Sequence, residues 1–509
     1  MIQVVLSMDE FAYDVRSLLQ AFYPGKKLVF LGKQQRKKAD DMIENIELKI
    51  SIEYKVDFIG ISFSQNDKLI LENSEKIKYN LIRNSANPTK DKLNLATRER
   101  RIYKNHLKRL LYRMLSTLTK RTLPWGTLTG IRPTKIAMRM LEEQWKESEI
   151  EKYMMDEYLC TKEKASLCVE IAKEESNILK GVDYKNGYSV YIGIPFCPTT
   201  CLYCSFTSYS IDKYKDQVEA YLDALFKEID DISTRAYNKK LVTIYIGGGT
   251  PTTLSADQLE RLLIKIRTSF PMEHVREVTV EAGRPDSITL EKLKVLKEQG
   301  VTRISINPQT MNQKTLDVIG RKHTVKQIID AFSMAREAGH DNINMDLIVG
   351  LPGEDENDLL TTLKEIDKLK PDSLTIHSLA IKRAARLNEN MEKYLDMLPT
   401  GTKEMLRLCN EYGKEAQYEP YYLYRQKNMA DNQENIGYAK EGKEGIYNIL
   451  IMEERHTIIA LGAGASSKFV SRDAKTVERS ENVKSVKDYI ERVDEMMERK
   501  HLFMEKYFC

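Results

Sequence analysis

The sequence predicts an α/β protein whose core is an open, partial (β/α)6 barrel. An α/β extension precedes this core, and a mostly helical region follows it. Two observations lead to this fold class. Strand-like and helix-like runs alternate six times between residues 186 and 400, and three cysteines form a tight cluster directly after the first of these strands.

The six predicted core strands are short apolar runs separated by amphipathic helical runs. They are Ser189–Ile194, Val242–Ile246, Glu277–Ala282, Arg303–Asn307, Asn342–Val349 and Asp372–Ser378. Helical connections between successive strands imply parallel pairing, with the helices packed outside a buried sheet. Six units fall short of the eight in a closed barrel. We therefore expect an open barrel whose active face lies at the carboxyl ends of its strands.

The core covers residues 186–400. The rest of the chain divides into an N-terminal domain (1–95), a helical connecting region (96–185) and a C-terminal substrate-side region (401–509). Residues 1–95 contain short β-rich runs and suggest a small α/β or β-rich unit. Residues 95–120 predict an amphipathic basic helix, which either faces an anionic ligand or presents a solvated surface; we favour the second interpretation.

The C-terminal region begins with a predicted helix, Thr402–Ala416, and its last residues, 483–509, form a second, charged helix. Between them, residues 418–425 are crowded with tyrosines and followed by Gln426. This crowding fits core packing and a flat hydrophobic ligand site equally well. The segment 461–467 contains a Gly-x-Gly turn, which alone is weak evidence for a site.

Composition also restricts the class of protein. The 509 residues carry 79 basic and 75 acidic side chains, and the net charge of +4 gives no general attraction to nucleic acid or to a membrane. No apolar run approaches the roughly 20 residues of a membrane span, and the first ten residues lack a secretory signal pattern. Seven cysteines, three of them clustered, fit a reducing compartment, so we expect a cytoplasmic protein.

Cys197, Cys201 and Cys204 form a C-x3-C-x2-C pattern that predicts a metal centre. Thiolates are the ligands of iron–sulfur clusters, and three of them leave one iron of a [4Fe–4S] cluster open. Structural zinc is the alternative. Zinc takes four ligands, however, and neither a second Cys pair nor a nearby histidine follows Cys204.

Further candidate ligand groups follow the later strands. The second strand ends in the run Gly247 to Thr252, where glycines allow a small ligand to approach the backbone. A side chain at Gly249 is therefore expected to obstruct that ligand while leaving the cysteine loop intact. Glu281, Gln309 and Asp346 lie at or near later strand ends and should converge on one cavity, and Arg321 offers a bidentate partner for a carboxylate.

Together these motifs resemble the radical S-adenosylmethionine (SAM) superfamily, in which an aromatic residue, here Tyr203, precedes the third cysteine. The run Tyr-Ile-Gly-Ile-Pro-Phe-Cys (191–197) narrows the resemblance to the oxygen-independent coproporphyrinogen III oxidase (coproporphyrinogen dehydrogenase) family, in its long branch with an N-terminal extension. The resemblance covers residues from about 188 to 467. The resemblance implies two catalytic residues, Tyr191 and Arg321. The SAM contacts it implies are Tyr191, Tyr203, Gly248, Gly249, Thr250, Glu281, Gln309, Arg321, Asp346 and Ala380.

The resemblance implies oxidative decarboxylation of coproporphyrinogen III to protoporphyrinogen IX in anaerobic heme biosynthesis. The cofactors would be a [4Fe–4S] cluster and SAM, and the partners a tetrapyrrole substrate, an electron donor of flavodoxin or ferredoxin type and an electron acceptor. Three positions depart from the oxidase pattern: Gly193 and Ser466 replace His, and Phe206 replaces a fourth Cys. Because Phe206 also fits the heme-trafficking relatives, a heme chaperone and another tetrapyrrole enzyme, such as one that opens heme anaerobically, remain alternatives.

Overall fold

The structure is a computed structural model. It describes residues 1–31, 46–54, 58–77, 90–184, 186–382, 384–399, 401–426, 429, 432–471 and 474–508, except for the side chains of 90–97. Two compact units are present. One comprises Met1–Val169 with Asp431–Gln433, and the other comprises Glu170–Ala430 with Glu434–Cys509.

The first unit contains a mixed sheet with the strand order β2-β1-β3-β4-β5. Its strands are β1 (Ile2–Leu6), β2 (Leu28–Leu31), β3 (Leu48–Tyr54), β4 (Phe58–Gln65) and β5 (Lys68–Lys76). Its helices are α1 (Ala12–Phe22), α3 (Lys90–Thr119), α4 (Thr134–Glu142) and α5 (Glu147–Tyr158), and α6 (Lys162–Lys180) begins in it. One apolar core joins the sheet to α1 and α3.

Helix α3 is the basic amphipathic helix that the sequence predicts. Its apolar side chains, among them Leu107 and Leu111, are buried in the core of the first unit. Arg98 and Arg113 are exposed on its surface. Arg109 instead turns inward and pairs with Glu157 at 2.5 Å. The described basic side chains of this helix are thus either solvated or bound within their own unit.

The second unit contains the six predicted parallel strands in sequence order within one large sheet. They are β6 (Gly187–Ile194), β9 (Lys240–Gly248), β10 (Glu277–Gly283), β11 (Arg303–Ile306), β12 (Ile343–Val349) and β13 (Ser373–Ser378). Each pairs in parallel with the next, for example Tyr191 with Tyr245 across β6 and β9. The prediction of a (β/α)6 core is confirmed.

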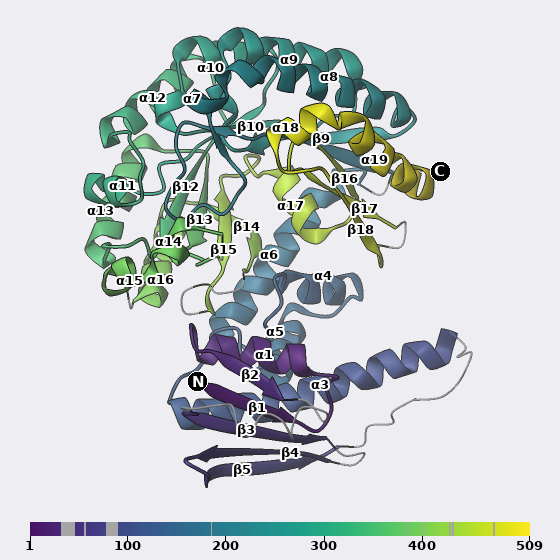
Figure 1. Ribbon diagram of the computed structural model, residues 1–509, viewed down its shortest axis with the longest axis vertical. Helices are drawn as coiled ribbons and strands as arrows, with labels where there is room; N and C mark the ends of the chain where they lie inside the picture. The colour runs from purple at the N-terminus through teal and green to yellow at the C-terminus, as the bar shows by residue number, and fades with distance from the viewer. Residues whose placement is uncertain are drawn as a thin grey trace. The chain divides into compact units, whose positions relative to one another are not determined.

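Helices cover the outer side of these strands in a continuous arc (Figure 1). They are α8 (Val218–Arg235), α9 (Ala256–Ser269), α10 (Leu290–Glu298), α11 (Gln313–Val318), α12 (Val325–Glu337) and α13 (Glu356–Leu369). The connecting segments also contain the short helices α7 (Ile211–Tyr214), α14 (Arg386–Glu389) and α15 (Met391–Tyr394). Local signals set the helix starts: Ser255, Thr324 and Asp355 accept backbone N–H groups in capping boxes. The arc leaves the inner side of the strands for the site.

The C-terminal region adds strands to both edges of this sheet. At one edge β15 (Asn435–Ala439) pairs antiparallel with β13, and β14 (Glu419–Tyr424) lies outside it. At the other edge β16 (Thr457–Leu461) pairs in parallel with β6 and is followed by β17 (Ser466–Val470) and β18 (Val477–Glu481). The sequence predicted a mostly helical region here, with helices at Thr402–Ala416 and within 483–509. These are present as α16 (Thr402–Glu415), α18 (Val486–Glu491) and α19 (Val493–Phe508), and α17 (Ile446–Glu453) is a further helix.

Among the described residues the sheet thus has eleven strands, with β14 and β18 at its two edges. The sequence analysis did not predict the C-terminal strands. They are only five or six residues long, and they lack the regular alternation of strand and helix that identified the core.

Candidate active site

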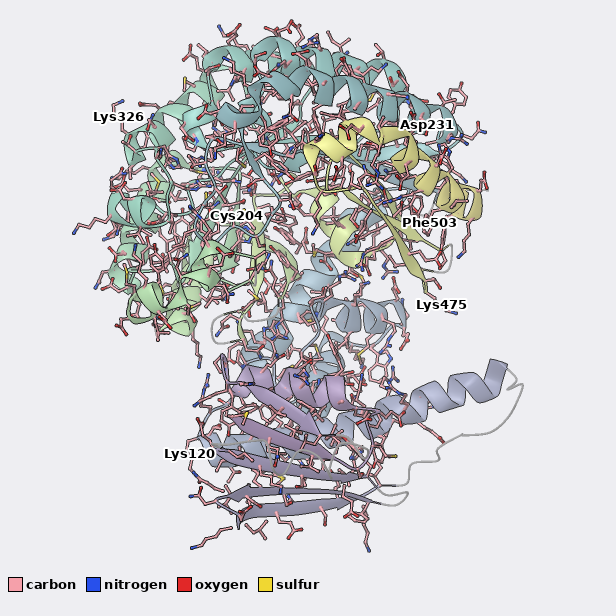
Figure 2. All side chains as sticks on the ribbon, in the orientation of Figure 1. Lys120, Cys204, Asp231, Lys326, Lys475 and Phe503 are labelled. Carbon is pink, nitrogen blue, oxygen red and sulfur yellow. The ribbon has the colours of Figure 1, made fainter. Side chains whose placement is uncertain are left out.

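A cavity of about 480 Å3 lies in the second unit. Every site residue that the sequence predicts lines it. These residues are Tyr191, Cys197, Cys201, Tyr203, Cys204, Gly248, Gly249, Thr250, Glu281, Gln309, Arg321, Asp346 and Ala380. Figure 2 places Cys204 on the concave side of the strands and helices. The fold therefore gathers side chains from more than 180 residues of sequence, Tyr191 to Ala380, at one place.

The cavity also contains residues that the sequence analysis missed, and most follow one rule. On the core strands, most cavity residues alternate: Thr279, Glu281 and Gly283 on β10, Asn344, Asp346 and Ile348 on β12, and Thr375 and His377 on β13, where Ser378 is an exception. Alternate side chains of a strand point to the same face, so these face the cavity while their neighbours pack against the helices. Polar residues at every second position of an otherwise apolar strand were the available signal.

The cysteine loop is held in place from several sides. Cys197 ends the two-residue strand β7 (Phe196–Cys197), which pairs with β8 (Tyr209–Ser210). Leu202 donates its backbone N–H to Ile319 O at 2.9 Å, which ties the loop to the turn before Arg321. Burial raises the pKa of the Cys197 thiol to about 11, although the Thr250 hydroxyl donates to its sulfur at 3.6 Å. A bound cation would therefore be needed to hold this residue as a thiolate at neutral pH.

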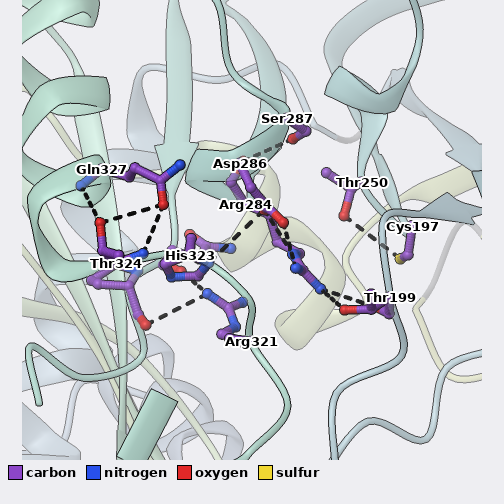
Figure 3. A network of polar contacts seen from close by, with 12 residues as sticks. Cys197, Thr199, Thr250, Arg284, Asp286, Ser287, Arg321, His323, Thr324 and Gln327 are labelled. Atoms are coloured by element: carbon purple, nitrogen blue, oxygen red, sulfur yellow. Dashed lines mark hydrogen bonds and ion pairs between the residues drawn. The ribbon is translucent and has the colours of Figure 1, made fainter. Parts of the chain in front are cut away.

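Arg284 anchors the middle of the same loop (Figure 3). Its guanidinium donates to Thr199 O at 3.1 Å and to Thr199 Oγ1 at 2.5 Å. It also forms a bidentate ion pair with Asp286, at 3.0 Å and 2.5 Å. Because Arg284 is only 3% exposed, this link between the loop and the end of β10 is protected from water and from screening.

The glycine run packs directly against the cysteine loop. Gly249 donates its N–H to Ile194 O at 2.7 Å, and Thr250 donates to Phe196 O at 2.7 Å. A Cβ at Gly249 would lie 2.5 Å from Phe196 O and 3.0 Å from Cys197 Sγ. The expectation that a side chain here leaves the cysteine loop intact is therefore wrong, because the close approach is between Gly249 and the loop itself.

Glu281 projects into the cavity from β10 and accepts a hydrogen bond from Tyr245 OH at 2.6 Å. Burial raises its pKa to about 7, although the Tyr245 hydrogen bond acts in the opposite direction. Gly247 is needed beside this pair, because a Cβ there would lie 2.9 Å from the Glu281 carboxylate. The carboxyl can therefore accept or donate a hydrogen bond near neutral pH.

Asp346 on β12 forms a second acidic group in the cavity. It accepts from Asn344 Nδ2 at 2.7 Å, and its Oδ2 lies 3.7 Å from His377 Nε2. Burial alone would raise its pKa, but the hydrogen bonds and charge of these neighbours lower it. Tyr424 OH lies 3.3 Å from the other nitrogen of His377. Asp346 is therefore held as a carboxylate, in contrast to Glu281.

Two buried polar atoms in the cavity have no partner among the described residues: Arg321 Nε and Gln309 Oε1. Arg321 is 5% exposed, and its Nη1 donates to Asn307 O. Gln309 has a φ of 68°, a strained conformation for a residue with a side chain. Unsatisfied buried groups and local strain are typical of a site arranged around a ligand. These two atoms fit a ligand that carries both a carboxylate and an amino group.

Tyrosines form one wall of the cavity. Tyr191, Tyr245 and Tyr447 stack on one another, with ring centroids 4.5 Å apart for Tyr245 and Tyr447. Tyr422 and Tyr424 form a second stacked pair, 6.2 Å apart. The aromatic segment that the sequence left open is thus divided: Tyr422, Tyr424 and Gln426 line the cavity, whereas Tyr418 binds Pro371 O and Tyr421 packs in an apolar cluster.

The positions that depart from the oxidase pattern lie in different surroundings. Phe206 lines the cavity and is 68% exposed. Gly193 lies beside β16, and its carbonyl accepts from Tyr221 OH at 2.5 Å. Gly193 and Ser466 are not among the residues that line the cavity. The described cavity has a single histidine, His377, on β13, and four strands of the sheet separate β13 from β6, which carries Gly193.

Comparison with known proteins identifies the family. Residues 191–366 match the model of the radical SAM superfamily. The chain is 42% identical over 409 residues to the oxygen-independent coproporphyrinogen-III oxidase-like protein HemZ of Bacillus subtilis, covering 80% of this chain and 82% of HemZ. The chain belongs to this radical SAM family. Its family membership implies a [4Fe–4S] cluster and SAM as cofactors, and it decides against structural zinc at the three cysteines.

This radical SAM protein is also similar to the heme chaperone HemW of Bacillus subtilis, with 34% identity over 60% of this chain and 76% of HemW. Among solved structures, coproporphyrinogen III oxidase (HemN) from Escherichia coli aligns over 63% of this chain and 73% of its own, with 23% identity and a TM-score of 0.49. Within the described residues, no helix combines the length and the apolar character needed to cross a membrane.

The residues present fit the cofactors that the family implies. Three thiols of one loop line the cavity, Gly249 leaves no Cβ beside Cys197 Sγ, and Arg321 and Gln309, which also line the cavity, keep buried atoms without a described partner. No group of three or more His, Cys, Asp or Glu among the described residues could hold a single metal ion, so the fit rests on the donor type and on this loop.

Proposed function

We propose that this protein catalyses oxidative decarboxylation of the propionate side chains of coproporphyrinogen III to vinyl groups. The observation that carries the proposal is that the cluster cysteines, the glycine run and a tyrosine wall line one cavity. The 42% identity to an oxidase-like protein supports the same reaction class. We further propose that the protein works in the cytoplasm with a donor of flavodoxin or ferredoxin type.

In this proposal Cys197, Cys201 and Cys204 hold the cluster. Arg321 and Gln309 bind the polar end of SAM, and Glu281 and Asp346 accept hydrogen bonds from its donors. Tyr191 belongs to the tyrosine wall and lines the cavity together with the cluster cysteines, where it would orient the reacting groups. Gly248, Gly249, Thr250 and the backbone at Ala380 shape the SAM side of the cavity, and Tyr203 of the cysteine loop lies near Arg321.

When bound, the cluster and SAM would supply the radical chemistry that removes one hydrogen atom from the β-carbon of a propionate. The propionate then loses CO2 and one electron, which passes to an external acceptor, and a vinyl group remains. The C-terminal region contributes Tyr422, Tyr424 and Tyr447 as a flat apolar surface for the tetrapyrrole. This surface supports the assignment of residues 401–509 as the substrate side.

The similarity to HemW, together with Phe206, favours one second candidate: a heme chaperone of the same fold. The two candidates differ in what happens to the tetrapyrrole. The test is anaerobic incubation of reduced, reconstituted protein with SAM and either coproporphyrinogen III or heme, followed by chromatography. Vinyl product from the first substrate supports the oxidase, and unchanged bound heme without vinyl product supports the chaperone. Opened heme would instead identify the ring-opening reaction. The Cys201→Ala variant is the control for chemistry that does not need the cluster.

A further inference from the structure

One basic side chain of the cavity, Lys382, has neither a carboxylate nor a hydrogen-bond partner among the described residues. Four basic residues line the cavity among those that the structure describes: Arg284, Arg303, Arg321 and Lys382. Arg284 pairs with Asp286, and Arg303 donates to Asn342, Ser373 and the Lys443 carbonyl. For Lys382 the described neighbours include no carboxylate. Its ammonium lies 5.3 Å from the centroid of the Phe206 ring.

Lys382 and Arg321 lie at different depths. Arg321 is 5% exposed, whereas Phe206, the ring beneath Lys382, is 68% exposed. Lys382 is itself partly buried, and its ammonium lies over this exposed ring in the outer part of the cavity, whereas Arg321 is buried inside it. Two cations that lack carboxylate partners, one deep and one at the edge, suit two separate anionic groups.

Burial of an ammonium group without an anion is unfavourable, and an aromatic ring compensates only part of the cost. The Arg321 site accounts for the single carboxylate of SAM in the proposed function. A carboxylate of the second ligand is then the natural partner for Lys382. A substrate with several propionates can place one propionate at the edge of the cavity while another propionate enters the cavity.

We infer that Lys382, oriented by the Phe206 ring, binds a propionate carboxylate of the tetrapyrrole substrate at the edge of the cavity. This inference rests on the proposed function and adds a specificity-determining residue to it. It also gives a physical role to Phe206: the ring holds the ammonium by a cation–π contact. A cysteine at this position could not make that contact.

The test is anaerobic binding of coproporphyrin III, which has four carboxylates, to the reconstituted protein with SAM, followed by porphyrin fluorescence. The tetramethyl ester of the same porphyrin is the uncharged probe. Lys382→Gln should weaken binding of the tetracarboxylate about tenfold, as expected for loss of a charge-assisted hydrogen bond, and leave the ester unchanged. Lys382→Arg should retain most of the affinity. Phe206→Leu should weaken tetracarboxylate binding roughly two- to fivefold.

Lys393→Gln is the matched control, because Lys393 lies 5.4 Å from the Tyr394 ring but outside the cavity. It should bind both probes as the wild type does. Equal tetracarboxylate affinity of Lys382→Gln and wild type would overturn the inference, and so would an equal loss for acid and ester. Weakened SAM binding in Lys382→Gln would overturn it too, by assigning Lys382 to the SAM site. This assay measures binding without turnover. If the wild type forms no vinyl product in the activity assay, the proposed decarboxylation is refuted, but the binding result for Lys382 still decides the present inference.

Discussion

A methyl group at Gly249 should damage the cluster site and the SAM site together. A Cβ there would lie 2.5 Å from Phe196 O, 3.0 Å from Ile194 O and 3.0 Å from Cys197 Sγ. Two of these atoms are backbone carbonyls of the strand and loop that hold Cys197, so a flexible side chain cannot relieve the contact. The same backbone accepts hydrogen bonds from Gly249 and Thr250 at 2.7 Å. Gly249→Ala must therefore displace the cysteine loop or break these bonds.

Overpacking of a well-packed position costs about 1–3 kcal/mol. SAM binding requires the loop in its native position, so this cost is subtracted from the binding free energy. Since each 1.4 kcal/mol is a factor of ten, SAM affinity should fall roughly 5- to 150-fold. The iron content should also fall below the roughly four irons per chain of a complete cluster.

The assay is anaerobic reconstitution of Gly249→Ala, with iron and sulfide counted per chain and SAM binding measured by equilibrium dialysis. Gly130→Ala is the matched control, because its Cβ would meet no atom within 4 Å. That variant should take up iron and bind SAM as the wild type does. A Gly249→Ala protein with a full cluster and wild-type SAM affinity would refute the packing argument.

Three further predictions follow from the site and the core. Cys197→Ala, Cys201→Ala and Cys204→Ala should each abolish the cluster in an iron assay, whereas Cys409→Ala, which alters a buried thiol of α16 outside the cavity, should retain it. Arg321→Ala should weaken SAM binding by about 1.5–3 kcal/mol, the value of a charge-assisted hydrogen bond, and unchanged affinity would remove Arg321 from the SAM site. Burial lowers the pKa of His456 to about 4, so the unfolded chain takes up a proton below its ordinary pKa of about 6.5 while the folded chain does not. The free energy of unfolding should therefore fall from pH 6.5 toward pH 4, by at most about 3 kcal/mol from this residue. In urea unfolding, the His456→Gln variant should lose less of this free energy than the wild type does between pH 7 and pH 5.

The sequence was sufficient to predict the core and the first set of site residues. Alternating strand and helix runs specify parallel crossovers, and parallel strands must bring their carboxyl ends to one edge. Residues chosen at those ends, from Cys197 to Asp346, accordingly lie in one cavity. The three-cysteine spacing is local, so it needed no tertiary information.

The parts that the sequence did not predict depend on contacts between distant segments. Tyr447 reaches the cavity from α17, and Lys382 pairs with a ring 176 positions earlier in the chain. Helical and strand periodicity carry no information about such pairs. Likewise, the runs Asn435–Ala439 and Thr457–Leu461 look like isolated apolar segments until β13 and β6 offer them an edge. The contact between Gly249 and Cys197 also required the fold, since 52 residues separate them.

The measurement that tests the central claim most directly is the transfer of hydrogen from substrate to cofactor. Coproporphyrinogen III deuterated at the propionate β-carbons is incubated anaerobically with SAM and the reduced, reconstituted protein, and the 5′-deoxyadenosine is analysed by mass spectrometry alongside the tetrapyrrole. The account predicts deuterium in 5′-deoxyadenosine together with vinyl product, and neither in the Cys201→Ala variant. Unlabelled 5′-deoxyadenosine without vinyl product would contradict it.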